Sequence, residues 1–192
     1  MTDWSAFYDA VAERPPHDTL LGALDRFGEP GLAVDLGCGD GRDTVELLRR
    51  GWRVVAIDSE PEAIARLRAR VGDQGDRLEA AVARFEEAEW PDASLVNSSF
   101  ALPFCPPGSF DAFWRRLRAS IAPGGRFSGQ LFGDRDAWAG SKDMTFHSRA
   151  AAEALFGGLE LERFDEVEED GQTALGDPKR WHVFHVIAQL PE

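Results

Sequence analysis

A short apolar run that ends in three alternating glycines constrains the fold of this chain more than any other feature. The run Leu32–Leu36 reads Leu-Ala-Val-Asp-Leu, and Gly37, Gly39 and Gly41 follow it. Such a run is typical of a strand buried on both faces of a parallel sheet. The glycines allow a tight turn and a close approach of the backbone to a ligand, because no Cβ stands in the way. The following segment, 42–51, has helical spacing and ends at a glycine. The sequence therefore predicts a strand, a ligand-binding turn and a helix.

The same alternation of strand and helix patterns continues along the chain. Further strands are expected at 52–57, 78–83, 93–97, 126–132, 159–167 and 181–190, and helices at 4–13, 18–27, 60–71, 110–121 and 148–156. The last two strands have no helix between them, so they pair antiparallel most easily, since a parallel pair needs a long crossover. We predict one α/β domain over 1–192, with an N-terminal helical lid (1–28) and a Rossmann-like, doubly wound core (29–192). Its sheet has seven strands, mostly parallel, with a C-terminal antiparallel hairpin and helices on both faces.

The composition excludes several classes of function. The chain has 192 residues, with 21 Lys and Arg against 34 Asp and Glu, for a formal net charge of -13. That charge disfavours nucleic acid and anionic membranes as partners, because both require clustered cations. Its two cysteines form no CxxC pair, so no structural zinc or other metal site is expected. Its start lacks the order of a signal peptide and no stretch reaches the length of a membrane span, so a soluble, cytoplasmic protein is expected.

The spacing of the glycines and two acidic residues indicate which ligand the turn binds. The pattern is Gly-x-Gly-x-Gly, whereas a dinucleotide fingerprint is Gly-x-Gly-x-x-Gly. Asp35, just before the turn, would repel a pyrophosphate but suits a ligand that carries an ammonium and a sulfonium. Asp58 ends the next strand, where a carboxylate accepts hydrogen bonds from ribose hydroxyls. The alternative for Asp58 is a simple N-cap of the helix at 60–71.

These residues carry a resemblance to a known family. The segment from Val34 to Arg42 resembles motif I of the class I S-adenosylmethionine-dependent methyltransferases, and Asp58 matches their ribose-binding acid. The segment 121–127 is similar to their Leu-x-Pro-Gly-Gly turn. The resemblance covers roughly residues 20–190, and the small tellurite-resistance methyltransferase type is the subfamily that this compact chain resembles. It implies methyl transfer from S-adenosyl-L-methionine, with S-adenosyl-L-homocysteine as product.

The resemblance also implies a set of cofactor contacts. They fall at the glycine turn and at the ends of the next strands: Asp35, Gly37, Cys38, Gly39, Asp58, Ser59, Phe85, Glu86 and Asn97. Two departures stand out. Arg84 occupies the position where the family commonly has an adenine-binding acid. Asn97-Ser98-Ser99-Phe100 lacks the two prolines of the Asn-Pro-Pro-Tyr motif, which argues against methylation of nucleic-acid amino groups.

Three of these residues also have simpler interpretations. Phe85 reads equally as a core aromatic residue, and Asn97 as a hydrogen-bonded polar residue at a strand end. Cys38 is expected to be a small buried residue and not a nucleophile.

The acceptor side is less defined by the sequence. Tyr8, Arg14, Trp138 and His147 are the candidates for acceptor or lid contacts, and no catalytic residue is assigned. The alternatives are an aromatic stripe over 4–8 that packs on the sheet, and a histidine at position 147 that serves as a cap or core group. The segment 179–182 and His185 are interpreted as structural. The acidic run 165–170 is interpreted as a solvated edge.

The acceptor is expected to be a small molecule, because the core fold takes up nearly the whole chain. The protein is expected to be a monomer or a homodimer. A thiol, selenide or telluride acceptor would need no general base. Two other functions stay open: an NAD-type oxidoreductase on a similar fold, which Asp35 and the glycine spacing oppose, and a cofactor-binding protein without catalysis.

Overall fold

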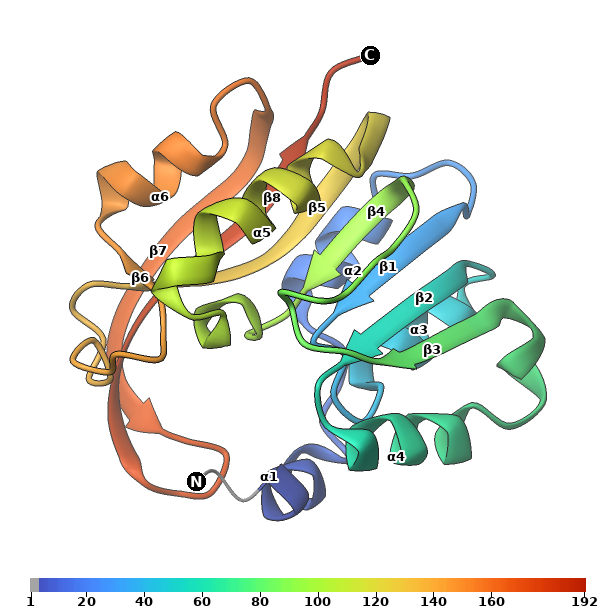
Figure 1. Ribbon diagram of the computed structural model, residues 1–192, viewed down its shortest axis with the longest axis horizontal. Coiled ribbons are helices and arrows are strands. Elements are labelled where there is room, and N and C mark those ends of the chain that lie inside the picture. Colours follow the sequence, from blue (N-terminus) through green and yellow to red (C-terminus); the bar gives the residue numbers. More distant parts are fainter. Residues whose placement is uncertain (1–3) are drawn as a thin grey trace.

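The computed structural model describes residues 4–192, apart from the side chains of residues 73 and 74, and its centre is a mixed sheet (Figure 1). The strands are β1 (Leu32–Leu36), β2 (Arg53–Asp58), β3 (Leu78–Val82), β4 (Ala93–Ser98), β5 (Ile121–Gly133), β6 (Phe146–His147), β7 (Glu160–Gln172) and β8 (Pro178–Gln189). Their order is β3-β2-β1-β4-β5-β8-β7, with β6 paired to β5 off this path. The first five strands of that order run parallel, whereas β8 and β7 are antiparallel, which confirms the predicted topology.

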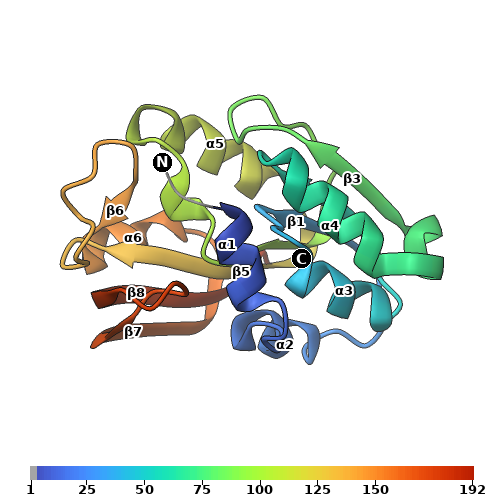
Figure 2. The ribbon, with the colours of Figure 1, turned by 90° about the horizontal axis from the view of Figure 1, so that it is seen from below.

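Six α-helices accompany the sheet in residues 4–192. They are α1 (Trp4–Val11), α2 (Asp18–Leu24), α3 (Arg42–Arg49), α4 (Pro61–Val71), α5 (Pro107–Ala119) and α6 (Arg149–Leu155). Figure 2 shows α5 on one side of the sheet and α2 and α3 on the other. None of the helices described is long and apolar enough to cross a membrane.

Alternation along the central strands builds the two layers of the core. In β1, Val34 and Leu36 pack with α5 and α6, whereas Ala33 packs with α2, α3 and α4 on the opposite face. Successive side chains of a strand point to opposite faces, so a strand with apolar side chains on both faces must be covered on both. This explains why the run at 32–36 predicted a buried parallel strand.

The structure departs from the predicted elements at two places that matter for the site. The strand β6 pairs with β5 and adds an eighth strand to the sheet. It has only two residues, so it is too short to give a periodic signal in the sequence. The strands β7 and β8 are longer than expected, and they pair from Glu160 with Gln189 as far as Gln172 with Pro178. As a result the hairpin extends beyond the sheet, and its tip lies at the same end of the molecule as α1 (Figure 1).

Candidate active site

A large cavity lies at the carboxyl ends of the parallel strands. Its volume is about 1460 Å³, and its walls come from α1, the glycine turn, the segments that follow β2, β3 and β4, the loop after β5 and the β7–β8 hairpin. Pockets for one small ligand are typically about 300–1,000 Å³. This cavity therefore has room for a cofactor together with a second molecule.

The glycine turn forms one end of the cavity, and its glycines are required by geometry. Gly37, Gly39 and Gly41 have φ of 70°, 55° and 92°, a region that L residues rarely adopt. A Cβ on Gly37 would lie 2.2 Å from the Cβ of Ala101, and one on Gly41 would lie 2.3 Å from Cδ1 of Leu67. The glycines at 37 and 41 therefore satisfy both a backbone conformation and a close contact.

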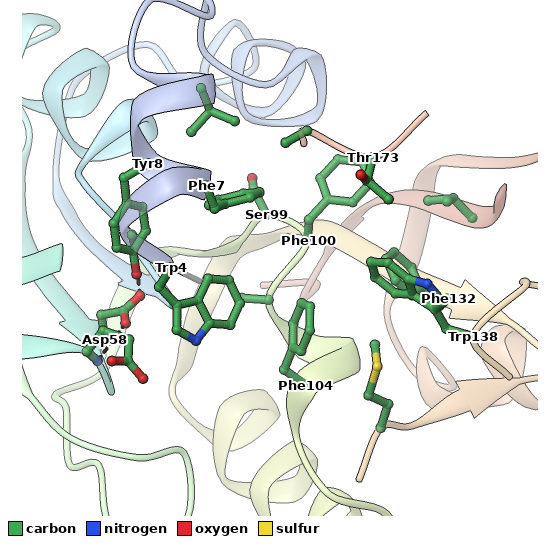
Figure 3. Close-up of a pocket in the computed structure, with 18 of the residues that line it drawn as sticks. Trp4, Phe7, Tyr8, Asp58, Ser99, Phe100, Phe104, Phe132, Trp138 and Thr173 are labelled. Atoms are coloured by element: carbon green, nitrogen blue, oxygen red, sulfur yellow. Dashed lines mark hydrogen bonds between the residues drawn. The ribbon is translucent and has the colours of Figure 1, made fainter. Parts of the chain in front are cut away.

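Asp58 ends β2 beside this turn and holds it in place. Its Oδ2 accepts a hydrogen bond from the Gly39 N–H at 2.8 Å, and its Oδ1 accepts one from the Glu60 N–H at 2.9 Å. The N-cap of α4 is Glu60, so Asp58 is not the N-cap residue that the alternative interpretation required. Burial raises the pKa of Asp58, while the backbone hydrogen bonds favour its charged form. Asp58 borders the cavity, as Figure 3 shows, and presents its carboxylate there.

Asp35 and Asn97 lie under the cavity, and the structure corrects the expectation that they contact a cofactor directly. Asp35 is 1% exposed and Asn97 is fully buried. The Asp35 carboxylate accepts hydrogen bonds from Thr44 Oγ1 at 2.6 Å and from Asn97 Nδ2 at 3.0 Å. Asn97 in turn accepts one from Ser128 Oγ at 2.7 Å. The pairing register places Asp35, Asn97 and Ser128 side by side on neighbouring strands, so their polar groups satisfy one another. Asn97 thus fits the simpler interpretation.

A second buried carboxylate, that of Asp43, connects this network to the chain that follows α1. It accepts hydrogen bonds from the His17 backbone N–H at 3.0 Å and from Ser99 Oγ at 2.6 Å. Burial is the largest single influence and opposes its ionisation, but the hydrogen bonds and electrostatic attraction of His17, together with the hydrogen bond from Ser99, outweigh it and hold the pKa of Asp43 at about 2. Burial, followed by the neighbouring charge of Asp43, raises the pKa of Asp35 to about 7. Nothing in the sequence pattern singled out Asp43 or His17.

The expected adenine side of the cavity contains Ser59, Phe85 and Glu86, which all border it. The Phe85 ring also packs against Phe113, with ring centroids 4.7 Å apart, so it is both a core and a cavity residue. Arg84 also borders the cavity and lies 3.8 Å from the Glu86 carboxylate.

Cys38 borders the cavity as well. It is 8% exposed, and burial raises the pKa of its thiol well above the usual value. The group is thus protonated near neutral pH, as expected for a residue that is not a nucleophile.

The helix α1 forms a wall of the cavity. Trp4, Phe7 and Tyr8 border the cavity, and Figure 3 shows Tyr8 pointing toward Asp58. Burial, together with the charges of Asp58 and Glu60, raises the pKa of Tyr8. Arg14, just after α1, also borders the cavity. The structure therefore places this aromatic stripe against the cavity, and the interpretation as a stripe packed on the sheet is wrong.

Side chains of α4 hold α1 in this position. Arg66 donates hydrogen bonds to Asp9 at 2.6 Å and to Ser5 at 3.1 Å. Arg70 donates one to the carbonyl oxygen of Ala12 at 3.2 Å.

The two acceptor candidates beyond β5 differ in position. Trp138 borders the cavity, whereas His147 does not. The His147 ring packs against Phe110, with centroids 4.9 Å apart, and burial lowers its pKa. His147 is therefore a partly buried residue packed on a core aromatic ring, in line with the simpler interpretation, and the acceptor role expected for it is not supported.

Sequence reasoning missed several residues that border the cavity, and three of them stand out. Trp181 and His185 on β8, which were interpreted as structural, face it, and so does Phe100 after β4. Phe100 has φ of 55°, the one positive value of a non-glycine residue in the described part of the chain. Its N–H donates a hydrogen bond to Gln130 Oε1 at 2.9 Å, which helps to hold this uncommon conformation. Within residues 4–192, no group of His, Cys, Asp and Glu forms a candidate metal site.

Comparison with known proteins supports a specific family. Residues 33–125 match a family model described as a methyltransferase domain. Among curated proteins, the chain is 34% identical over 117 residues to a carboxy-S-adenosyl-L-methionine synthase of Shewanella oneidensis, a match that covers 56% of this chain and 47% of that protein. It is 32% identical over 111 residues to a probable cobalt-precorrin-6B C(15)-methyltransferase of Methanothermobacter thermautotrophicus, covering 56% and 55%. The chain spans about half the length of these curated relatives.

Solved structures share the fold over almost the whole chain. TehB from Haemophilus influenzae superposes with a TM-score of 0.81 at 16% identity, covering 95% of this chain and 65% of that one. A 1,6-didemethyltoxoflavin-N1-methyltransferase of Burkholderia thailandensis, solved with its substrate and S-adenosylhomocysteine, has a TM-score of 0.68 at 20% identity and covers 99% and 80%. At these identities the likeness shows the fold, and the TehB match agrees with the tellurite-resistance resemblance at that level. The matched domain, the curated relatives and the fold together support the resemblance of this chain to the class I S-adenosylmethionine-dependent methyltransferases, whose cofactor is S-adenosylmethionine.

Proposed function

We propose that the protein transfers a methyl group from S-adenosylmethionine to a small-molecule acceptor. The observation that carries this proposal is the continuity of the cavity, which joins the glycine turn and Asp58 to an aromatic region on the opposite side. Figure 3 shows Asp58 at one end and Phe132 and Trp138 at the other. A methyltransferase needs this arrangement, because methyl donor and acceptor must meet in one enclosed space.

The cofactor fits the end of the cavity that Asp58 marks. The Asp58 carboxylate already accepts two backbone hydrogen bonds, and the lone pairs that remain are positioned to accept bonds from the ribose hydroxyls. Gly37 and Gly39 let the backbone approach the ligand, and Phe85 offers a flat apolar surface to the adenine. Asp35 acts indirectly in this proposal, because its hydrogen bond with Thr44 joins β1 to α3 across the turn.

Methyl transfer requires the protein mainly to position the methyl donor and the acceptor. A lone pair of the acceptor forms a bond to the methyl carbon while the carbon–sulfur bond breaks, and its electrons stay on sulfur to give S-adenosylhomocysteine. The sulfonium is already an activated leaving group, so alignment and exclusion of water supply most of the acceleration. A general base is required only when the acceptor is protonated at the working pH.

We further propose that α1 is a lid over both ligands, as the N-terminal part of a single domain. Its inner side carries Trp4, Phe7 and Tyr8, and its outer side is attached to α4 through Arg66. A protein lacking residues 1–16 should keep a folded sheet and some cofactor binding but lose turnover. Full turnover of a confirmed acceptor by the truncated protein would refute the lid.

Calorimetric titration with S-adenosylhomocysteine tests the cofactor assignment, with NADH as the competing ligand. We expect S-adenosylhomocysteine to bind and NADH to give no heat, since the Gly-x-Gly-x-Gly turn lacks the Gly-x-Gly-x-x-Gly spacing that binds a pyrophosphate. Asp58→Asn should weaken binding by about 1.5–3 kcal/mol, or about 10–150-fold, because a charge-assisted hydrogen bond is lost. The matched control is Asp92→Asn, an exposed carboxylate that does not border the cavity. Equal affinities of the two variants would refute the assignment.

Turnover is tested separately from binding. Release of S-adenosylhomocysteine in the presence of candidate acceptors identifies an enzyme, whereas tight cofactor binding without release across a broad panel indicates a non-catalytic binding protein.

A further inference from the structure

Four aromatic side chains line the cavity on the side away from Asp58. Phe100, Phe132, Trp138 and Trp181, here called the aromatic wall, come from the segment after β4, from β5, from the loop after β5 and from β8. Their ring centroids form a connected set, with Phe132 6.2 Å from both Phe100 and Trp138 and 5.7 Å from Trp181. Figure 3 shows Phe100, Phe132 and Trp138 grouped on this side.

A lysine lies behind this wall. The Nζ atom of Lys179 is 3.4 Å from the ring centroid of Trp138, 3.5 Å from that of Trp181 and 4.3 Å from that of Phe132. Its side chain is 1% exposed, and Lys179 does not border the cavity. The ammonium therefore contacts the rings and cannot reach an acceptor.

Asp136 completes this arrangement. Its Oδ1 lies 3.0 Å from Lys179 Nζ, and its side chain is fully buried. The same carboxylate accepts hydrogen bonds from the N–H of Trp138 at 3.0 Å and from the N–H of His182 at 3.2 Å. The ion pair thus ties the loop after β5 to β8, and it fixes the relative positions of Trp138 and Trp181.

The buried charge also restricts what the wall can bind. Burial of an ammonium is unfavourable, and the ion pair and the ring faces offset that cost. The cation draws the π electrons toward itself, so the cavity side of the same rings is a poor site for a second cation. The hairpin side of the cavity offers no cation to an anion either. Among the hairpin residues described, none that borders the cavity is Lys or Arg, and Glu169 and Asp177 are carboxylates. The arginines that do border the cavity come from other segments, after α1, at the start of α3 and after β3: Arg14, Arg42 and Arg84.

We propose that the aromatic wall binds a flat, uncharged aromatic or heteroaromatic acceptor, and that Lys179 is the positioning residue that holds the wall. The proposal rests on the proposed function, because it assigns the substrate class of the same cavity. A flat ring gains stacking contacts with the tryptophans, and it displaces water from a region that offers few hydrogen bonds.

Four ligands of one skeleton test the substrate class. Naphthol is flat and neutral, naphthoic acid is its anionic analogue, naphthylmethylamine its cationic analogue and decahydronaphthol its saturated analogue. Each is titrated by calorimetry into protein saturated with S-adenosylhomocysteine. We expect naphthol to bind at least about tenfold more tightly than each of the other three, a difference of about 1.4 kcal/mol.

The order of addition separates two failures. If S-adenosylhomocysteine itself does not bind, the proposed function fails. If it binds but naphthol does not, or if a charged or saturated analogue binds as tightly as naphthol, the assignment of the aromatic wall is overturned and the cofactor assignment stands.

Lys179→Met tests the positioning role, with Lys142→Met as the matched control. Lys142 is an exposed lysine in the same loop region and does not border the cavity. We expect Lys179→Met to weaken naphthol binding about tenfold while the affinity for S-adenosylhomocysteine stays within about twofold. It should also narrow the preference for naphthol over naphthylmethylamine, because the charge behind the rings is gone. A purely structural role does not predict this change of preference.

An unchanged naphthol affinity or an unchanged preference in Lys179→Met would overturn the role of the lysine. If Lys179→Met fails to fold, Trp138→Ala gives an independent test. Trp138 is 36% exposed, so its loss leaves the core intact. Trp138→Ala should weaken the binding of naphthol at least about tenfold, with little effect on the binding of S-adenosylhomocysteine. A naphthol affinity equal to that of the wild type would overturn the proposal.

Discussion

Replacement of Gly37 by alanine should destabilise the fold and weaken cofactor binding together, because one residue serves both the turn and the cavity. Gly37 has φ of 70°, and an added Cβ would lie 2.2 Å from the Cβ of Ala101 and 3.6 Å from its Cα. Ala101 belongs to the segment that follows β4, so the clash can be relieved only if that segment moves away from the turn. The N–H of Gly37 also donates to the Ile57 carbonyl oxygen at 2.8 Å, which limits movement of the turn itself.

The expected magnitude is the sum of two separable costs. The left-handed conformation costs an L residue about 1–2 kcal/mol. Insertion of a methyl group into a packed site costs about 1–3 kcal/mol. The free energy of unfolding should therefore fall by about 2–5 kcal/mol.

Two control glycines separate these costs. Gly176 has φ of 89° with nothing within 4 Å of an added Cβ, so Gly176→Ala should show the conformational cost alone. Gly28 has neither a positive φ nor a neighbour within 4 Å, so Gly28→Ala should be nearly neutral. Urea unfolding of the three variants gives the free energies, and calorimetry with S-adenosylhomocysteine gives the affinity of Gly37→Ala. A Gly37→Ala protein as stable as Gly28→Ala, with unchanged affinity, would refute the role given to this turn.

Three further results are expected. Between the ordinary pKa of Asp35 near 3.8 and its value of about 7 in the folded protein, the folded state keeps a proton that the unfolded chain releases, so this group lowers the free energy of unfolding as pH rises. Urea unfolding across that pH range should show that the free energy of unfolding declines less steeply in Asp35→Asn than in the wild type. Parallel pH dependences of the two proteins would count against the burial assigned to Asp35. Burial raises the pKa of the Cys105 thiol to about 12 and that of Cys38 well above normal, so a thiol reagent at about pH 8 should modify both only after unfolding; rapid modification of the native protein would contradict this. With a net charge of -13, binding to duplex DNA or RNA at physiological salt should be undetectable, and a filter-binding signal that falls steeply with salt would show that the expectation is wrong.

The glycine turn could be predicted from the sequence because its requirement is local. Glycines at alternate positions after a strand indicate a turn whose backbone adopts positive φ values, which few other residues tolerate. The positive φ values of Gly37, Gly39 and Gly41 confirm this. The topology followed for a similar reason, since apolar runs and their connections limit how strands pair. Asp58 was also placed correctly beside the cavity, because the carboxyl end of a parallel strand always lies at that edge.

The direction of polar side chains near the strand ends could not be predicted in this way. Asp35 and Asn97 lie within two residues of a strand end, where a side chain points either into the cavity or under it. Their burial depends on partners from three strands and a helix, and those partners meet only in the folded sheet.

The residues on the acceptor side of the cavity could not be predicted from the sequence for a different reason. The tip of the β7–β8 hairpin reaches the cavity because two antiparallel strands extend beyond the sheet, and strand length is poorly encoded in an acidic, exposed segment. Lys179 offers no signal either, since its burial depends on a carboxylate more than forty residues earlier in the chain and on three rings from separate segments.

A crystal structure of the protein with S-adenosylhomocysteine tests the central claim most directly. The account predicts that the ribose hydroxyls lie within hydrogen-bond distance of the Asp58 carboxylate. The adenine should lie beside Phe85, and the sulfur should face the space between α1 and the aromatic wall. A ligand bound elsewhere, or one that occupies this cavity with its ribose away from Asp58, would contradict the account.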